Sequence, residues 1–393
     1  MRPQFSCTGI RTHTRQMISR RITRSPFTTS TNHPLPQQVS VEKELSYIVS
    51  KFPPVAHAFA YGSGVFPQSA ETSTGSSVHP NAPQAITQIQ GGKQKMIDII
   101  FGVSCAEEWH GHNLQQNPHH YGALGSLGKC AVARIQELGA GIYFNPFVTV
   151  NGTLIKYGVV SMDTLCRDLT TWDTLYLAGR LQKPTRTVYG NPRVQEVNQV
   201  NLSSAVNVAL LLLPETFVER DLYATIAGIS YLGDPRMSVG GDDPRKVQNM
   251  MEHQLDDFRR LYSPYLSGME NVSSIGYQGK LQQCMDPVVR GRIVRNLPSA
   301  FRENLYSNYC KKYNTASDAQ NCNSEELYKS AHCTTDIRIA GDTCLPQQIQ
   351  QAIRKTVQWP SFGQSIKSAV TAGVARSWRY AREKRRKATL GTR

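Results

Sequence analysis

The sequence contains no apolar run long enough to cross a membrane, no Cys-x-x-Cys pair and no acidic residue before Glu42. A membrane-spanning helix needs about 18 or more consecutive apolar residues, whereas the longest run here covers residues 208–213. The nine Cys are scattered, with the spacing of neither a disulfide framework nor a zinc module. These absences argue against a membrane-spanning helix and a disulfide-stapled secreted domain, and free thiols in a reducing compartment are expected.

Basic residues are concentrated at the two ends of the chain. The formal net charge is +15, yet residues 42–342 carry a net charge of −1. Residues 1–41 hold six Arg, and residues 343–393 hold eleven Lys or Arg with Glu383 as their one acidic residue. A nucleic-acid-binding domain carries its basic patch on the folded body. Nucleic acid is therefore not the expected partner, and each basic end needs its own explanation.

The first end has the composition of a mitochondrial transit peptide. Its Arg residues are interleaved with Ser and Thr, and it lacks the apolar segment of a secretory signal. We predict a presequence over residues 1–34; the alternative is a disordered basic tail.

The last end, residues 361–393, is predicted to be a basic amphipathic helix. Apolar residues recur there every fourth position and basic residues flank them, which suits an anionic membrane surface. The alternative is an ordinary surface helix with a charged tail. The residues predicted to contact the membrane are Ile366, Val370, Val374, Trp378, Arg379 and Arg382.

A small-residue turn and an acidic strand form the centre of the sequence. Gly62, Ser63 and Gly64 follow an apolar run, and Asp98 lies inside the β-like run of residues 96–101. Such a turn lets backbone N–H groups approach a triphosphate, and a carboxylate beside it can hold a magnesium ion. The alternative is a common flexible turn and a satisfied strand-end Asp. Between them, residues 68–92 are rich in small and polar residues and are expected to form a loop.

Four His occur between residues 110 and 120, but Pro118 and their spacing do not match a zinc-binding helix face. Hydrogen bonds to a nucleotide base or ribose are the other interpretation, with His110, Asn113, Asn117 and His120 as candidates.

Asn151-Gly152 then predicts a hairpin. Its returning strand carries Lys156, either solvated or a phosphate ligand, and Asp168 lies on the helix that follows. Arg180 and Lys183 come shortly afterwards.

From residue 201 the pattern becomes helical. Three predicted helices between residues 203 and 262 favour a compact winged-helix-like domain, and their acidic residues weigh against DNA binding. Residues 266–360 are polar and are given no assignment. The fold class is therefore α+β: a domain over residues 42–200, a helical domain over residues 201–265, and the basic C-terminal helix.

These blocks together resemble the mitochondrial phosphatidate cytidylyltransferase family, also called the mitochondrial translocator assembly and maintenance family. The resemblance covers roughly residues 42–265 and then the tail. The blocks that carry it are residues 59–65, 96–101, 109–121, 154–159, 168–184, 213–215, 231–237 and 371–373.

The resemblance implies a nucleotidyltransferase domain followed by a winged-helix-like domain, with the site between them. It implies condensation of CTP with phosphatidate to CDP-diacylglycerol and pyrophosphate, feeding phosphatidylglycerol and cardiolipin synthesis. The enzyme would be a peripheral protein on the matrix side of the inner mitochondrial membrane.

The residues expected to act are given by the matching blocks. Magnesium (Mg2+) is expected on Asp98, and the catalytic residues are expected to be Asp98, Lys156 and Asp168. The residues expected to bind CTP or phosphate are Gly62, Ser63, Gly64, His110, Asn113, Asn117, His120, Arg180, Lys183, Asp234 and Arg236.

Two departures from the family pattern bear on the metal. Relatives usually carry two acids and a Pro after the strand of Asp98, where this chain has Ser104, Cys105 and Ala106, and Ile100 offers no second carboxylate. If those acids bind metal, Glu107, Glu108 or Asp168 must replace them. The alternative function is a catalytically impaired, membrane-bound mitochondrial scaffold. RNA nucleotidyl transfer is less supported, because paired acids and a basic body are lacking.

Overall fold

A five-stranded mixed sheet forms one centre of the fold, with strand order β3-β4-β2-β1-β5. The structure, a computed structural model, describes residues 36–66, 78–90, 95–235, 243–275, 279–313 and 334–371. The pair β2–β4 is parallel and the other neighbouring pairs are antiparallel. The strands are β1 (His57–Tyr61), β2 (Ile97–Val103), β3 (Ile142–Val150), β4 (Thr153–Ser161) and β5 (Thr185–Tyr189).

The predicted hairpin at Asn151-Gly152 is confirmed. Both residues have positive φ, 47° and 68°, and they join the antiparallel strands β3 and β4. Two left-handed residues match the right-handed twist of the flanking strands, which is why Asn-Gly favours this turn.

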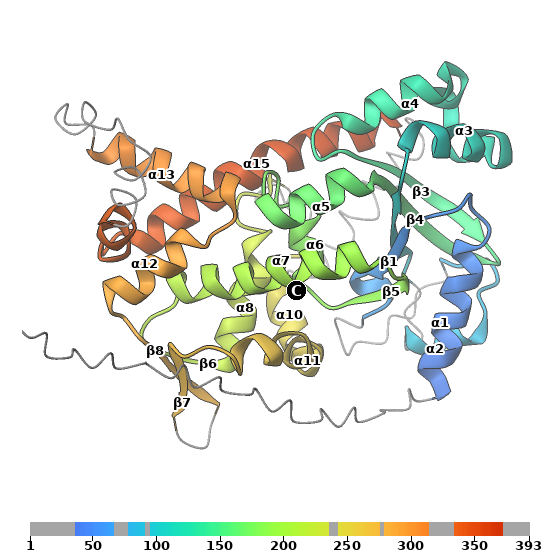
Figure 1. The fold of residues 1–393 in the computed structure, drawn as a ribbon. Coiled ribbons are helices and arrows are strands. Elements are labelled where there is room, and N and C mark those ends of the chain that lie inside the picture. Colours follow the sequence, from blue (N-terminus) through green and yellow to red (C-terminus); the bar gives the residue numbers. More distant parts are fainter. Residues whose placement is uncertain are drawn as a thin grey trace, which may run out of the picture. The chain divides into compact units, whose positions relative to one another are not determined.

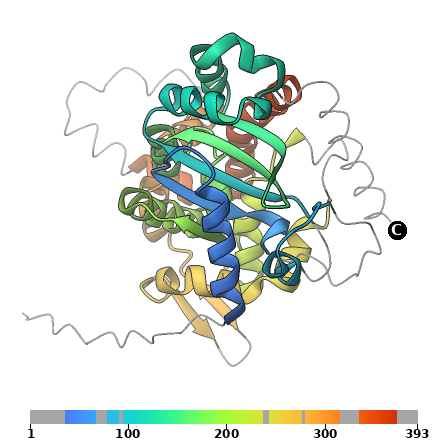
Figure 2. The ribbon, with the colours of Figure 1, turned by 90° about the vertical axis from the view of Figure 1, so that its right-hand side faces the viewer.

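Helices cover both faces of the sheet (Figures 1 and 2). The N-terminal helices pack on one face; they are α1 (Pro36–Val49), α2 (Gln84–Ile89), α3 (Ala106–Gln116) and α4 (Gly128–Glu137). The helices of the other side are α5 (Met162–Thr171), α6 (Ala178–Leu181), α7 (Pro192–Leu212), α8 (Glu219–Ile229), α10 (Lys246–His253), α11 (Leu255–Leu266), α12 (Pro287–Arg295), α13 (Ser299–Tyr313) and α15 (Leu345–Thr371). Part of the loop expected over residues 68–92 is thus helical, since Ala85 and Ile86 of α2 are buried; residues 67–77 and 91–94 lie outside the described residues.

The two faces of the sheet belong to two separate hydrophobic clusters, as the two-residue period of a strand requires. We name each face after one residue that it carries. The Asp98 face carries Phe59, Tyr61, Asp98, Ile100, Lys156 and Val160. The Tyr157 face carries Ala58, Ala60, Ile97, Ile99, Tyr157 and Val159.

The predicted boundary between residues 200 and 201 falls inside a helix. Helix α7 is capped by the Asn191 side chain, starts with Pro192 and continues to Leu212. It packs against α5, α8 and α15, so one hydrophobic cluster joins the Asp98 face of the sheet to the helices that follow. A second, antiparallel sheet of order β6-β8-β7 lies beside those helices. Its strands are β6 (Thr216–Val218), β7 (Val272–Ile275) and β8 (Lys280–Gln283).

The segment without an assignment, residues 266–360, contributes to this same cluster. Val294, Phe301 and Ile349 from α12, α13 and α15 are buried in it. The boundary predicted at 360/361 falls inside α15, which contains Pro360.

The start of the predicted membrane helix packs on the body. The Lys367 amine is buried and donates to the Gln136 and Leu138 carbonyl oxygens at the end of α4. Of the predicted contact residues, Ile366 is half-exposed. The side chain of Val370, and all of Val374, Trp378, Arg379 and Arg382, lie outside the described residues, as does the predicted presequence.

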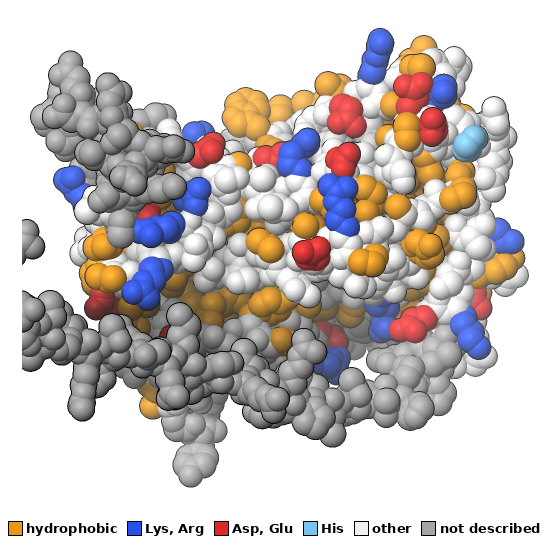
Figure 3. Space-filling view, viewed as in Figure 1, with side chains coloured by type: hydrophobic (Ala, Val, Ile, Leu, Met, Phe, Trp, Pro, Cys, Tyr) orange, Lys and Arg blue, Asp and Glu red, His pale blue; other side chains and the backbone are white. Residues whose placement is uncertain are grey.

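None of the helices in the described part of the chain is long and apolar enough to cross a membrane. On the face shown in Figure 3, acidic and basic side chains are interspersed. That mixture fits the near-zero net charge of residues 42–342.

Candidate active site

Three polar side chains lie in a row across the Asp98 face. Tyr61 of β1 pairs with Asp98 of β2, which pairs in turn with Lys156 of β4. Neighbouring strands are about 4.8 Å apart, so the register alone makes these residues neighbours. The Lys156 Nζ lies 3.6 Å from Asp98 Oδ1, and the two side chains are 16% and 29% exposed. A carboxylate and an ammonium group are therefore both accessible to a ligand at one end of the sheet.

The Gly-Ser-Gly turn lies against this row. It follows β1 directly and forms one short 3-10 turn, Gly62–Gly64. Gly62 has φ +78°, and a Cβ atom there would lie 3.6 Å from Asp98 Oδ2. A Cβ atom on Gly64 would lie only 2.7 Å from the Met96 carbonyl oxygen, so the turn and the start of β2 can approach closely only because residue 64 is Gly. The structure thus brings together the turn and the strand that the sequence separates by some thirty residues.

Gln90 holds the turn in place, a role that the sequence analysis missed. Its buried side-chain amide donates to the carbonyl oxygens of Gly64 and Lys95, and its amide oxygen accepts from the Lys95 N–H. One side chain therefore fixes the turn to the segment that enters β2. Only its position in a polar, low-complexity stretch was visible in the sequence.

Arg180 extends the row beyond Tyr61. Its guanidinium group lies 5.4 Å from the centre of the Tyr61 ring and 3.8 Å from that of Tyr176, and it donates to the Tyr176 carbonyl oxygen. Burial and the nearby Asp98 carboxylate raise the pKa of the Tyr61 phenol, so it stays a neutral hydroxyl. Arg180 is thus held over the row by two aromatic faces.

Lys183 and Lys246 form a second cationic group around Tyr231. The Lys183 amine donates to the Ser230 hydroxyl at 2.7 Å and lies 4.8 Å from the Tyr231 ring centre, and the Lys246 amine lies 5.2 Å from that centre. Burial, with the positive charges of Arg180 and Lys246, lowers the pKa of Lys183 well below its usual range. An anion would relieve this repulsion. Lys246 was missed because it lies in a segment dominated by acidic residues.

His110 and Asn113 lie on the Tyr157 face, away from Asp98. The His110 ring bonds to the Tyr121 hydroxyl and to the Gln136 side chain, both at 2.8 Å, and burial lowers the pKa of His110 to about 4. Asn113 donates to the hydroxyls of Tyr121 and Tyr157. Neither residue has any exposed surface, so neither can contact a nucleotide, and the predicted binding role does not agree with their placement.

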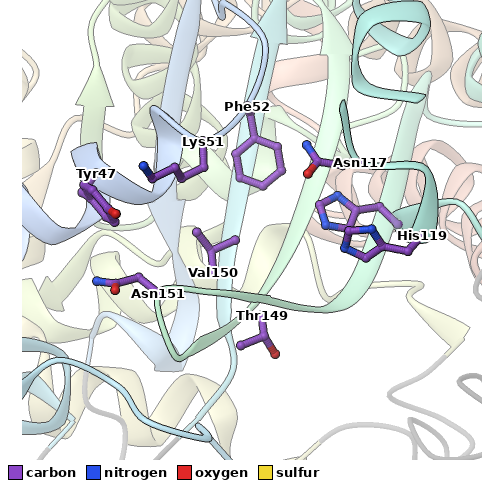
Figure 4. Close-up of a pocket in the computed structure, with 9 residues that line it drawn as sticks. Tyr47, Lys51, Phe52, Asn117, His119, Thr149, Val150 and Asn151 are labelled. Carbon is purple, nitrogen blue, oxygen red and sulfur yellow. The ribbon is translucent and has the colours of Figure 1, made fainter. Parts of the chain in front are cut away.

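Asn117 and His120 belong to the same side. The His120 ring bonds to the Tyr157 hydroxyl at 3.0 Å, and Asn117 donates to Asn113. Both line a pocket of about 310 Å³ between α1 and the β3–β4 hairpin, into which Lys51 and His119 also project (Figure 4). Phe52 forms part of that pocket and packs on Tyr157, which places the pocket on the Tyr157 face. The structure does not bring these residues to the Asp98 row.

Asp168 has a structural environment instead of the expected catalytic one. It is 2% exposed, and its two carboxylate oxygens accept the backbone N–H groups of residues 174, 175, 177 and 178. These bonds fix a loop in which Trp172 and Leu175 have positive φ. The loop leads into α6, which carries Arg180. Binding a metal would strip Asp168 of these bonds, so its role is to position that helix.

Asp234 lies in the loop after α8 that also carries Tyr231, and it is buried. Gly233, with φ +88°, packs this loop against the backbone of Arg354 in α15. Arg236 lies outside the described residues.

The positions where family acids were expected are at the wrong end of β2 to share a metal with Asp98. Asp98 is the second residue of the strand, and Ser104 follows its last residue. Six residues of strand span about 20 Å. Glu107 pairs with Lys129 at the start of α3, beyond the same end. Ser104 and Cys105 therefore do not remove a ligand from the Asp98 row, and Glu107 and Glu108 cannot replace one.

The donor set of the row fits a metal ion shared with a ligand. In the described parts of the chain, no three His, Cys, Asp or Glu side chains are grouped to hold a metal by themselves. Magnesium usually takes one or two protein carboxylates together with substrate phosphates and water. The single accessible carboxylate of Asp98, beside a turn open to phosphate, is such a set.

Comparison with known proteins identifies the family of this chain. The family model described as "Phosphatidate cytidylyltransferase, mitochondrial" matches residues 45–387. Proteins of that name are similar to this chain. The one from Schizosaccharomyces pombe (strain 972 / ATCC 24843) is 35% identical over 368 residues, which is 91% of this chain and 87% of that protein. The one from Xenopus laevis is 36% identical over 341 residues, or 86% and 92%. The one from Saccharomyces cerevisiae (strain ATCC 204508 / S288c) is 42% identical over 229 residues, or 57% and 55%. The chain belongs to the mitochondrial phosphatidate cytidylyltransferase family.

Proposed function

We propose that this chain transfers the cytidylyl group of CTP to phosphatidate, and that the triphosphate binds at the Gly62–Gly64 turn, Asp98 and Lys156. The products are CDP-diacylglycerol and pyrophosphate. The observation that carries the proposal is the row of Tyr61, Asp98 and Lys156 beneath that turn, which strand register fixes on one accessible face.

The chemistry requires that two anions meet. The lipid phosphate is a monoester with a second pKa of about 6, so its attacking oxygen is largely ionised near neutral pH and needs little help from a base. The phosphate oxygen attacks the α-phosphorus of CTP, and the bond to the β-phosphate oxygen breaks to release pyrophosphate. Catalysis is then mostly positioning and charge compensation.

Two cations near Asp98 would supply that compensation. Lys156 lies beside Asp98, and Arg180 lies over Tyr61. Both can bind phosphate oxygens, Lys156 as a point charge and Arg180 as a planar fork. The turn offers the backbone N–H groups and the hydroxyl of Ser63 as neutral donors. Asp98 would hold magnesium, which neutralises triphosphate charge when bound.

We also propose an identity for each of the two parts of the fold. The sheet with its turn would be a nucleotidyltransferase domain, and α8, α10 and α11 with the small sheet would be winged-helix-like. Supporting this, the row comes from the sheet whereas Lys246 and Ser230 come from the helical part.

Location follows from the relatives' names and the two basic ends. The chain would be imported into mitochondria by residues 1–34. It would bind the matrix side of the inner membrane peripherally, through residues beyond about 364. Anionic lipid there would attract the excess of Lys and Arg in the tail.

The direct test is pyrophosphate release from CTP and magnesium, with and without phosphatidate vesicles, together with isolation of CDP-diacylglycerol. We expect release only when phosphatidate, CTP and magnesium are all present. A folded protein that binds vesicles but releases no pyrophosphate would support the scaffold alternative instead. Omitting magnesium while keeping full activity would contradict the metal role of Asp98.

A second measurement tests the tail. Removing residues 372–393 should lower activity on phosphatidate in vesicles more than on detergent-dispersed phosphatidate. Equal losses on both would contradict the membrane role.

A further inference from the structure

Helix α15 exposes a short apolar stripe. Trp359, Phe362 and Ile366 are 72%, 47% and 51% exposed. Their spacing of three and four residues places them on one side of the helix. A contiguous apolar patch on a surface can mark a binding site. With Pro235 and Gln358, the first two residues line a shallow pocket of about 160 Å³.

This stripe is connected to the second cationic group. Tyr231, whose ring faces both Lys183 and Lys246, begins the loop that ends at Pro235. Gly233 in the same loop packs on the backbone of Arg354, one helical turn before Gln358. Four residues span at most about 14 Å. The cations and the apolar pocket are thus joined by one short loop held against α15.

Arg180 links the second cationic group to the Asp98 row. It lies over the Tyr61 ring, and its charge is close enough to Lys183 to lower the pKa of that amine. Arg180 is therefore close to two charged groups of residues. One contains Asp98 and suits a metal-bound triphosphate. In the other, the Lys183 amine donates to neutral acceptors, the Ser230 hydroxyl and the carbonyl oxygen of Gly179, and a bound phosphate beside it would favour its charged form.

We propose that the lipid substrate binds with its phosphate at Lys183 and Lys246 and with an acyl chain on Trp359 and Phe362. This assignment rests on the proposed function and names its second subsite. A phosphate monoester needs cationic donors, and a diacylglycerol moiety needs an adjacent apolar surface; the loop from Tyr231 to Pro235 places the two side by side. Arg180 then lies where the two phosphates meet.

The occupant of the stripe is a phospholipid and not a second copy of this chain. The residues that follow α15, 372–393, contain eight Lys or Arg and one Glu. A strongly basic segment that continues from an apolar stripe repels its own copy and matches an anionic lipid surface. Aromatic side chains are also favoured at the boundary between lipid headgroups and acyl chains.

The activity test compares two chain lengths of phosphatidate. The variant Trp359→Ala/Phe362→Ala should raise KM for dioleoyl phosphatidate in mixed micelles by about tenfold or more, because two apolar contacts are lost. It should change KM for water-soluble dihexanoyl phosphatidate and for CTP by less than about twofold. The matched control is Leu127→Ala, which removes another side chain that is 61% exposed and should change neither value. Equal losses on both lipids would overturn the acyl-chain assignment.

The phosphate-binding part of the proposal is tested with the variant Lys246→Met. Its matched control is Lys43→Met, because Lys43 is an exposed lysine on α1. Lys246→Met should raise KM for both phosphatidates by about tenfold and KM for CTP by less than about threefold. A larger effect on CTP than on phosphatidate would assign Lys246 to the nucleotide and overturn the subsite.

Tryptophan fluorescence, which needs no catalytic turnover, tests this inference independently of the proposed function. Trp109 and Trp172 are buried, so in a Trp378→Phe background Trp359 should dominate the environment-sensitive emission. Phosphatidate vesicles should shift that emission to the blue, and Trp359→Phe should abolish the shift. An unchanged emission spectrum would overturn the acyl contact even in an active enzyme. A shift in a protein that forms no CDP-diacylglycerol would support the lipid surface while the proposed reaction fails.

Discussion

Lys156 and Tyr157 are neighbours in β4, yet their side chains lie on opposite faces of the sheet. Lys156 joins Asp98 in a partly exposed row of charges beneath the glycine turn. Tyr157 is buried, and its hydroxyl bonds to Asn113 and His120. The Asp98 face thus has charged groups with room for a ligand, whereas the Tyr157 face has neutral groups that bond to one another.

The difference shows how to separate a binding site from a buried polar network. Both faces hold residue types that bind nucleotides, and the sequence analysis proposed residues of both faces as ligands of CTP or phosphate. Buried polar groups must find partners inside the protein, and on the Tyr157 face they do. On the Asp98 face, Asp98 and Lys156 pair with each other but stay partly exposed, so a ligand can still reach both charges. Exposure and charge distinguish the two faces more clearly than residue identity.

The largest expected effect comes from Asp98→Asn. Removing the one carboxylate of the row should lower kcat/KM by about 10³-fold or more, because a metal-binding charge contributes several kcal/mol to the transition state. The fold should persist, since the side chain is partly exposed. Asp163→Asn is the control, because Asp163 is an exposed carboxylate paired with Arg193. An Asp98→Asn enzyme with a normal rate would place the chemistry elsewhere.

Lys156→Met should have the next largest effect. It removes the ammonium group that would bind the triphosphate and that lies 4.3 Å from the centre of the Phe144 ring, while keeping an unbranched side chain of similar length. We expect kcat/KM for CTP to fall about 10²-fold, with KM for phosphatidate changed far less. Steady-state kinetics with each substrate varied in turn would measure this. A loss confined to phosphatidate would exchange the two phosphate subsites.

Asn113→Ala should reverse the pattern, with a loss of stability and little loss of rate. Three hydrogen bonds of a fully buried amide disappear, and the Tyr121 and Tyr157 hydroxyls lose a donor. The free energy of unfolding should fall by about 2–4 kcal/mol. The kcat/KM of the protein that remains folded should change less than about fivefold, as measured below the unfolding transition. A rate loss comparable to that of Lys156→Met would return Asn113 to the substrate site.

Much of this division could have been read from the sequence, and some could not. The hairpin at Asn151-Gly152 follows from local turn chemistry, and the alternation of Lys156 and Tyr157 follows from strand period. That α3 packs on the Tyr157 face depends on contacts between distant segments. His110 and Asn113 therefore gave a nucleotide-binding pattern with no indication of which face they join.

The C-terminal third of the chain also depends on contacts between distant segments. Ile349, Ile353 and Val357 recur every four residues and are buried along α15, so a helical signal was present within the segment given no assignment. A boundary was predicted directly after Pro360, yet α15 continues through this residue. Lys367 belongs to the predicted basic helix, yet its amine is bound to the end of α4.

A smaller effect is expected from pH, through His110. Its pKa is about 4 in the folded protein, against an ordinary value of 6.5 for a solvated histidine, so between these values the unfolded chain binds the extra proton. Its contribution to stability is therefore complete above about pH 6.5 and is lost as pH falls toward 4. Between pH 7 and 5, the unfolding free energy of His110→Gln should fall by about 2 kcal/mol less than that of the parent.

Urea denaturation at both pH values would measure this difference. The shared contribution of His57, whose pKa burial also lowers to about 4, cancels between the two proteins. The exposed His112, changed to Gln, is the matched control and should leave the pH dependence unaltered. Identical pH dependence in His110→Gln and the parent would show that His110 is not buried in its neutral form.

The smallest effect is expected where the family pattern suggested the largest. Ser104→Asp/Cys105→Asp restores acids at the exposed end of β2, about 20 Å from Asp98 by strand rise. Carboxylates that far away cannot share one magnesium ion, whose ligands lie about 2.1 Å from it. We therefore expect kcat/KM and its dependence on magnesium concentration to change less than about twofold, because the new carboxylates would not bind the metal.

A large gain in activity, or a lower magnesium requirement, would mean that the strand end takes part in catalysis and that the Asp98 row is incomplete. Without such a gain, Ser104 and Cys105 give no reason to consider the enzyme impaired, because the residues they replace lie beyond the reach of the site.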